Sequence, residues 1–361
     1  MAHSIMRTNF KISRQRTFIL LGVIGAAFLL AGCGQKQQES GQTTASGQTQ
    51  QAKSNRVVVY CSVDDVYAKP ILAALAKQTG LQVDALYDVE AAKAAGLANK
   101  IRAEHNRPRA DIFWASTILQ SQLLANEGQL APYKSPSASD VPDGFKDPKG
   151  CWTGLGVRAR ILVATRPLEQ KSLAFVPHSL PGKFAISNPQ FGTCTDWASA
   201  YGARWGQERT LDFFRRMKAE GVRILPGNAD VALGVANGNL AYGVVDSDDY
   251  LAQKREKKPI FLVKTTQDNV LVPGSASIIA GAPHEENARK LLDALLSAQG
   301  EQMLVKGMPG MFSVRHMKEV GNWQSGGEDF SYLKDTPTED LSKWRPMWEQ
   351  LRKPLADILT P

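Results

Sequence analysis

The sequence predicts an α/β protein whose folded part is divided into two lobes with a ligand cleft between them. From residue 56 onward, short apolar runs typical of buried strands alternate with amphipathic helical segments. That alternation is characteristic of α/β folds with a largely parallel sheet. The same alternation recurs after a long β-type run at 156–165, and about 300 residues are enough for two separate cores.

The first lobe is expected over residues 56–155. Strands are predicted at 57–60, 81–87 and 111–114, because these runs are short and apolar. Helices are expected between them, one ending at Gly80, one over 91–105 and one ending at Gly128, where glycine can end a helix. Each predicted strand therefore leads into a loop at its carboxyl end.

The second lobe is expected over residues 156–265, and residues 266–361 are expected to return to the first lobe and to form C-terminal helices. The apolar periodicity indicates a final helix near Trp344. The remaining elements are predicted as strands at 183–187, 222–225, 240–245, 260–264 and 275–280, and as helices at 196–205, 209–219, 230–236 and 285–298.

The N-terminus has the pattern of a secretory signal peptide over residues 1–32. An apolar run at 18–30 is shorter than the roughly twenty residues that a membrane span needs. The alternative is a short membrane anchor, but the run ends on Leu30-Ala31-Gly32-Cys33, which is a lipobox. A basic region without acidic residues precedes it, formed by Arg7, Lys11, Arg14 and Arg16.

The lipobox predicts that Cys33 is lipidated and becomes the mature N-terminus, held at a membrane surface by acyl chains. Residues 33–55 are rich in Gln, Ser, Thr and Gly, so we expect a flexible tether. The protein is therefore expected to be exported, and to face the periplasm or the exterior from the cell membrane or the outer membrane. The sequence leaves open which membrane holds the anchor.

Charge and cysteine content exclude some classes of partner and site. The net charge of +8 falls to +4 when the four basic residues of the signal segment are removed. No basic stripe with interleaved aromatic residues is present, so we expect no nucleic-acid partner. Cys61, Cys151 and Cys194 fit no metal-ligand spacing. Cys61 is expected in the core, and the sequence leaves open whether Cys151 and Cys194 pair.

Polar residues after the predicted strands are the candidate ligand groups, because ligands of open α/β sheets bind beyond the carboxyl ends of the strands. The segment at 192–196 opens a helix, where unpaired amides and the helix dipole suit an anion. Its alternative role is an ordinary N-cap by Thr195 or Asp196, and Asn228 has the same ambiguity. The candidates up to that point are Ser62, Asp64, Glu90, Ser116, Arg158, Thr193, Thr195 and Asn228.

Three carboxylates, Asp246, Asp248 and Asp249, follow another predicted strand of the second lobe. They could bind a cation or accept hydrogen bonds from hydroxyl or ammonium groups. The alternative is a solvated turn in which Asp caps the next helix. Because the strand end faces the predicted cleft, we favour a ligand-binding role.

Taken in order, these segments resemble the family 1 solute-binding proteins of ABC importers, in the branch labelled ferric-iron binding. The resemblance covers roughly residues 56–320. It implies the two-lobed periplasmic-binding-protein fold of class II type, with two hinge strands between the lobes, and delivery of the ligand to a permease and an ATPase. The matching stretches are 57–62, 88–91, 110–114, 152–154, 188–193, 227–228 and 246–249.

The ferric label is not expected to transfer directly. Ferric-binding relatives have two consecutive tyrosines where this chain has Asp248-Asp249, with a single Tyr250 after them. Ala115-Ser116-Thr117 also stands where many relatives carry an acidic residue. Other relatives take phosphorylated sugars or organophosphates. We therefore expect a phosphorylated or other anionic organic ligand, with ferric iron held by Asp248 and Asp249 as the alternative.

The predicted function is capture of a small polar solute by a monomeric, lipid-anchored receptor with no resident cofactor. A ligand sensor would share this fold. A lipoprotein hydrolase is the alternative among enzymes, but the sequence has neither a G-x-S-x-G nor an H-E-x-x-H motif and only five histidines. We therefore expect no enzymatic activity.

Overall fold

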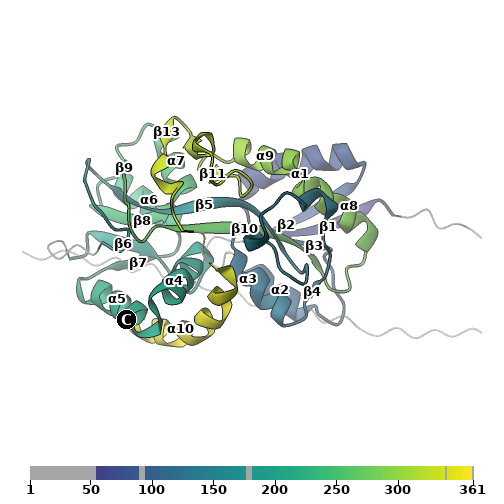
Figure 1. Ribbon diagram of the computed structural model, residues 1–361, viewed down its shortest axis with the longest axis horizontal. Coiled ribbons are helices and arrows are strands. Elements are labelled where there is room, and N and C mark those ends of the chain that lie inside the picture. Colours follow the sequence, from purple (N-terminus) through teal and green to yellow (C-terminus); the bar gives the residue numbers. More distant parts are fainter. Residues whose placement is uncertain (1–53, 89–93, 176–180, 338–339, 360–361) are drawn as a thin grey trace, which may run out of the picture. The chain divides into compact units, whose positions relative to one another are not determined.

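The computed structural model describes residues 54–88, 94–175, 181–337 and 340–359. Residues 52–361 form one compact unit around an 11-stranded sheet with the order β2-β1-β3-β10-β5-β8-β6-β7. Figure 1 shows that β5 and β10 run through the middle of this unit, with helices packed on both faces of the sheet. The predicted α/β class is confirmed.

The β1–β3 end of the sheet is parallel, and its strands fall within the residues expected for the first lobe. β1 (Arg56–Cys61) lies between β2 (Gln82–Tyr87) and β3 (Ile112–Ala115). The short strand β4 (Leu130–Ala131) pairs with β10. The helices here are α1 (Asp65–Thr79), α2 (Ala95–Ala103) and α3 (Ile118–Asn126).

The β6–β8 end is also parallel, and its strands fall within the residues expected for the second lobe. β6 (Phe184–Ser187) lies between β7 (Arg223–Leu225) and β8 (Tyr242–Asp246). β9 (Phe261–Val263) pairs with β5. The helices here are α4 (Gly192–Trp205), α5 (Gln207–Ala219), α6 (Asn228–Ala236) and α7 (Ser247–Arg255).

Two long antiparallel strands connect the two ends. β5 (Thr153–Ala164) and β10 (Val270–Ile279) pair with each other. β10 then pairs with β3 at one end, and β5 pairs with β8 at the other. Both strands are buried along their whole length. This is the arrangement of a two-lobed binding protein with two hinge strands.

The C-terminal part contacts both ends of the sheet. α8 (Glu285–Leu296) and α9 (Ala298–Gly307) pack against α1, and β11 (Met311–Phe312) pairs with β5. α10 (Trp344–Leu359) packs mainly against α4 and α5. The remaining elements are the hairpin β12 (Gln324–Ser325) and β13 (Glu328–Asp329) and the 3-10 helices Pro136–Ala138, Asp143–Phe145, Val320–Trp323, Ser331–Leu333 and Leu341–Lys343.

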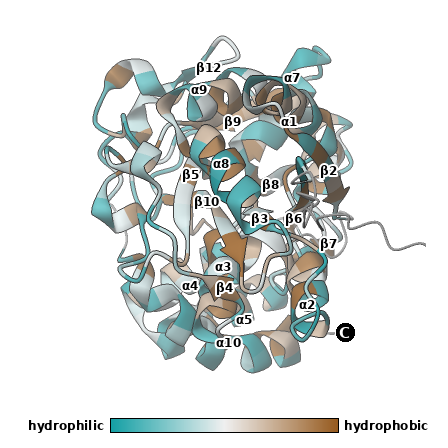
Figure 2. Cartoon of the chain, turned by 90° about the vertical axis from the view of Figure 1, so that its right-hand side faces the viewer, coloured by the Kyte–Doolittle hydropathy of each residue, from teal (hydrophilic) through white to brown (hydrophobic). Residues whose placement is uncertain are grey.

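Hydrophobic side chains are concentrated between the helices and the sheet. Figure 2 shows hydrophilic residues on the outer helix faces and a strongly hydrophobic α3. Ile118, Leu119 and Leu124 of α3 are fully buried. Among the described helices, none has the length and apolar character that crossing a membrane requires.

Several element boundaries differ from the sequence expectation. α4 begins at Gly192 rather than at 196, and β10 begins at Val270 rather than at 275. The described part of the second helix begins only at Ala95, because Ala94 has a positive φ of 64°. α7 was expected only in the alternative in which Asp caps a following helix, and its bounds were not predicted, since its apolar residues Tyr250 and Leu251 are adjacent rather than periodic.

The structure decides whether Cys151 and Cys194 form a disulfide. Cys61, Cys151 and Cys194 are buried and none of them is in a disulfide, so Cys151 and Cys194 do not pair in this structure. Cys61 lies in the core at the end of β1, as expected. Burial raises the pKa of the Cys194 thiol to about 11, which keeps it protonated at neutral pH. Cys33 and Glu90 lie outside the described residues.

Candidate functional site

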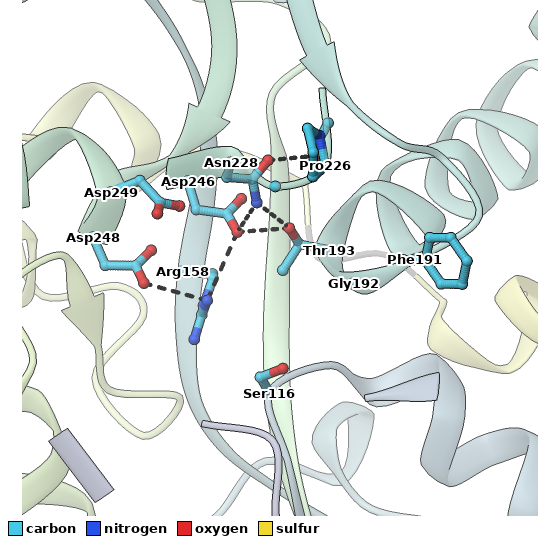
Figure 3. A pocket seen from close by; sticks show the side chains of 12 residues that line it. Ser116, Arg158, Phe191, Gly192, Thr193, Pro226, Asn228, Asp246, Asp248 and Asp249 are labelled. Atoms are coloured by element: carbon cyan, nitrogen blue, oxygen red, sulfur yellow. Dashed lines mark hydrogen bonds and ion pairs between the residues drawn. The ribbon is translucent and has the colours of Figure 1, made fainter. Parts of the chain in front are cut away.

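The N-termini of α4, α6 and α7 converge on one pocket, together with the loop before α3 (Figure 3). The first amides of each helix have no carbonyl partner within the helix, and they carry the positive end of its dipole. The enclosed space is small, about 30 Å³. The lining residues are Ser116, Arg158, Ser187, Phe191, Gly192, Thr193, Pro226, Gly227, Asn228, Asp246, Asp248 and Asp249.

Asp246 is the centre of a hydrogen-bond network inside the pocket wall. Its Oδ2 accepts from the hydroxyl of Thr193 at 2.6 Å and from the amide of Asn228 at 2.9 Å. Its Oδ1 accepts from Nη1 of Arg160 at 2.8 Å. Because both oxygens are used and the carboxylate is 1% exposed, Asp246 fixes the positions of Thr193 and Asn228 within the wall.

Arg160 is a fully buried cation behind this wall. Besides Asp246, its Nη1 donates to Asn228 Oδ1 at 2.8 Å, and its guanidinium lies 5.3 Å from the ring centre of Trp197. Burial acts to lower its pKa, but the charge and hydrogen bond of Asp246, together with Cys194 and Asp249, raise it overall. Arg160 therefore supports the site from behind rather than lining it.

Arg158 is the guanidinium that lines the pocket. Its Nη1 lies 3.3 Å from Oδ2 of Asp248 and 3.7 Å from Oδ2 of Asp246. Burial would lower its pKa, but Asp248, Asp246 and then Asp64 raise it overall. Both Arg158 and Asp248 are about 95% buried, so their attraction is little screened by water. The pocket thus contains a fixed positive charge beside its carboxylates.

Of the described candidates from the first lobe, Ser116 lines the pocket and the others lie behind or beside it. Ser116 lines the pocket, and its backbone amide donates to the hydroxyl of Ser62 at 2.8 Å. Ser62 is therefore a support for Ser116. Asp64 is the N-cap residue of α1 and is close enough to influence the charge of Arg158. Glu90, the remaining candidate from the first lobe, lies outside the part of the chain that the structure describes.

The alternative N-cap roles at α4 and α6 are wrong. The N-cap of α4 is Phe191 and that of α6 is Gly227, so Thr195 and Asn228 lie inside their helices. Thr195 donates to Gly192 O at 2.7 Å and does not line the pocket. Asn228 is held by the Asp246 network instead. The alternative at 246–249 is right in one respect, because Asp246 is the N-cap residue of α7, although its side chain makes no cap hydrogen bond. The segment is not a solvated turn, however, because Asp246 and Asp248 are buried.

Some functional residues were missed or only partly anticipated. Ser187, Phe191, Pro226 and Gly227 line the pocket, although only their neighbours were selected from the sequence. Ser187 donates to Asn228 Oδ1 at 2.6 Å and belongs to the same wall. Its position at the carboxyl end of β6 is the signal that could have identified it.

A metal ion would have to compete with the internal arginines. Ligand atoms of Asp246, Asp248 and Asp249 lie within 4.8 Å of one another, which is compatible with a hard cation. Two of these carboxylates are paired with Arg158, however. Tyr250 does not line the pocket. It is buried against Phe330, and burial, together with Glu328, raises its pKa.

The fold and the pocket define a two-lobed solute-binding protein. The sequence profile of the "Bacterial extracellular solute-binding protein" family matches residues 56–307, and the chain belongs to this family. Members of the class bind solutes outside the cytoplasm for ABC importers and are not enzymes, as the sequence predicted.

Sequence relatives cover most of the chain at low identity. An uncharacterized protein of Haemophilus influenzae is 25% identical over 298 residues, which are 78% of this chain and 81% of the relative. The major ferric iron-binding protein of Neisseria gonorrhoeae is 23% identical, with 69% of this chain and 78% of the relative covered.

Solved structures confirm the two-lobed fold. Iron-bound HitA from Pseudomonas aeruginosa has a TM-score of 0.73 at 20% identity, covering 84% of this chain and 99% of HitA. AfuA from Actinobacillus pleuropneumoniae, solved with fructose-6-phosphate bound, has a TM-score of 0.71 at 19% identity, covering 84% and 98%. At this identity the similarity concerns the fold.

Proposed function

We propose that this protein captures a phosphorylated or similarly anionic organic solute and delivers it to an ABC permease and ATPase. The observation that carries the proposal is the convergence of the N-termini of α4, α6 and α7 on a pocket that also contains Arg158. Helix N-termini and a guanidinium are donors suited to phosphate oxygens. The solved structure of AfuA with fructose-6-phosphate is a precedent for this class of ligand on the same fold.

The carboxylates favour a ligand with hydroxyl or amine groups beside its anionic group. Asp249 is only partly buried and lines the pocket, and Asp248 lies beside it. Carboxylates accept hydrogen bonds and repel a second anion, so the non-phosphate part of the solute should supply donors. An acidic wall next to the helix N-termini thus supports an organic phosphate rather than inorganic phosphate.

Ferric iron is the second candidate, supported by the spacing of Asp246, Asp248 and Asp249 and by relatives named as ferric iron-binding proteins. Against it, Arg158 holds a positive charge within 3.7 Å of two of these carboxylates. Repulsion between the guanidinium and a trivalent cation would weaken metal binding.

Thermal shifts of the folded unit, residues 52–361, separate these candidates. The probes are fructose-6-phosphate, fructose, inorganic phosphate and ferric citrate. A ligand at 100 times its dissociation constant adds about 2.7 kcal/mol to the free energy of unfolding. We expect stabilisation by the sugar phosphate and less by fructose or phosphate alone. Stabilisation by ferric citrate only, lost in Asp248→Asn, would overturn the proposal.

We further propose that Cys33 carries the lipid anchor, that residues 33–55 form the tether and that the folded unit is a monomer with lobes at 56–155 and 156–265. The lipobox supports the anchor. Mass spectrometry of the mature N-terminus should find a diacylglyceryl cysteine, and Cys33→Ser should release the protein from membranes. An unmodified N-terminus upstream of Cys33 would contradict the lipid anchor. A dimer in analytical ultracentrifugation would contradict the monomer.

A further inference from the structure

α3 and α4 begin close together, although they belong to opposite ends of the sheet. The backbone amide of Leu119, the second residue of α3, donates to Oδ1 of Asp196 in α4 at 3.2 Å. Asp196 is fully buried. A side-chain oxygen that accepts from the second amide of a helix performs the role of an N-cap. The N-cap oxygen of α3 is therefore supplied by the other lobe.

The residue that would normally cap α3 does not do so. Thr117 holds the N-cap position, with the extended backbone typical of one (φ −135°, ψ 151°), but its side chain makes no cap hydrogen bond. Its hydroxyl is buried and has no hydrogen-bond partner among the described residues. Threonine is a favourable N-cap residue. The Thr117 hydroxyl is therefore a second possible acceptor for the Leu119 amide, which donates to Asp196 in this structure.

The surroundings of Asp196 explain why a carboxyl group can lie there. Its Oδ2 accepts from the hydroxyl of Thr195 at 3.2 Å, and the N-terminus of α3 provides a favourable dipole. The titratable groups that face it are Asp246 and Cys194. Burial raises the pKa of Asp196 to about 7, and the nearby Asp246 adds to this, while the Leu119 and Thr195 hydrogen bonds act against it.

We propose that Asp196 and Thr117 are alternative N-caps of α3, and that the exchange between them accompanies closing and opening of the ligand cleft. In the closed arrangement Asp196 caps α3 across the cleft. When the lobes separate, the Leu119 amide loses this acceptor, and rotation of the Thr117 side chain replaces it. The inference rests on the proposed two-lobed binding function, but not on the identity of the ligand.

The exchange of caps lowers the free-energy cost of opening the cleft, because the N-terminus of α3 in the first lobe keeps an acceptor. A buried amide left without an acceptor is unfavourable, so each cap stabilises the arrangement in which it is used. Removing the Asp196 cap should favour the open arrangement, and removing the Thr117 cap should favour the closed one. Opposite effects of two substitutions on the same helix end are specific to an exchange of caps.

Distances between spin labels in the ligand-free unit, residues 52–361, test this directly at pH 6. Lys77→Cys on α1 and Arg216→Cys on α5 are exposed label sites at opposite ends of the sheet, whereas the three native cysteines are buried. Asp196→Ala should raise the open-to-closed ratio about five- to tenfold, and Thr117→Val should lower it by a similar factor. Asp196→Asn keeps an acceptor oxygen and should stay near the parent protein.

The proposal would be overturned if Asp196→Ala and Thr117→Val changed the open-to-closed ratio in the same direction. Unchanged spin-label distances in both variants would overturn it as well. Melting curves by circular dichroism establish that each variant is folded. If Asp196→Ala does not fold, Asp196→Ser and Thr117→Val still test the opposite signs. Because no ligand is added, failure of this inference is separate from failure of the proposed ligand class, which the thermal-shift series decides.

Discussion

Oδ2 of Asp248 lies 3.3 Å from Nη1 of Arg158, so a carboxylate that the sequence presents as a possible metal ligand already has a cationic partner within the protein. The pair joins the N-terminus of α7 to the hinge strand β5. An anionic ligand that binds Arg158 would compete with Asp248 for the guanidinium. Binding at this pocket is therefore coupled to the position of α7.

Replacement of Arg158 should destabilise the fold as well as the site. Arg158→Ala leaves Asp248 buried without its cation, and breaking a buried pair from one side costs about 3–5 kcal/mol. Urea unfolding measures this loss. Arg289→Ala is the matched control, because its pair with Glu285 is about half exposed and should contribute at most about 0.5 kcal/mol. Equal losses in the two variants would contradict a special role for the buried pair.

Gly310 should be intolerant of a side chain. It has a φ of 89°, and a Cβ at this position would overlap the backbone of Ser247 and Asp248 at the start of α7. Gly310→Ala should therefore lower both stability and probe binding. Gly327→Ala is the control, since its φ of 81° costs about 1–2 kcal/mol of strain but its Cβ meets open space. A smaller loss for Gly310→Ala than for the control would show that α7 can shift without cost.

A side-chain contact joins α1 and α7, which belong to opposite ends of the sheet. Nη2 of Arg255 donates to the hydroxyl of Tyr67 at 2.7 Å, and the guanidinium lies 5.8 Å from the ring centre. Tyr67→Phe removes the hydrogen bond but keeps the ring. We expect dissociation of fructose-6-phosphate to become about two- to fivefold faster in stopped-flow measurements. Tyr133→Phe removes a hydrogen bond to Asp293, and neither residue lines the pocket, so this control should leave the rate unchanged.

Closure should depend on pH through Asp196. Burial raises the pKa of this carboxyl group to about 7 in the closed arrangement, and an exposed carboxyl has a pKa near 3.8. The closed arrangement therefore binds the proton more tightly, so closure is strengthened below about pH 7 and weakened as the pH rises through 7. The spin-label distances should shift toward the open state between pH 6 and pH 8. Asp196→Asn should show no such shift; an equal shift there would assign the effect to another group.

Local patterns in the sequence predicted most of the elements. The apolar runs that became β1, β3 and β6 are buried throughout or nearly so, and such runs need only neighbouring residues to be recognised. The bounds of α7 were not predicted, and the helix entered only as an alternative, because it begins with Ser-Asp-Asp, which has low helical propensity. It is stabilised by burial of Tyr250 and Leu251, and sequence propensity does not report such tertiary packing.

The sequence by itself determined the two-lobed α/β class, the lipobox and the strand-end loops that form the pocket. Only the tertiary structure decided which polar groups face the ligand. Asp246, Thr193 and Arg158 were equal candidates in the sequence and all line the pocket, but the hydroxyl of Thr193 is already hydrogen-bonded to the carboxylate of Asp246. The physical reason is that strand and helix patterns act over a few residues, whereas ion pairs and caps join residues that folding brings together from distant segments.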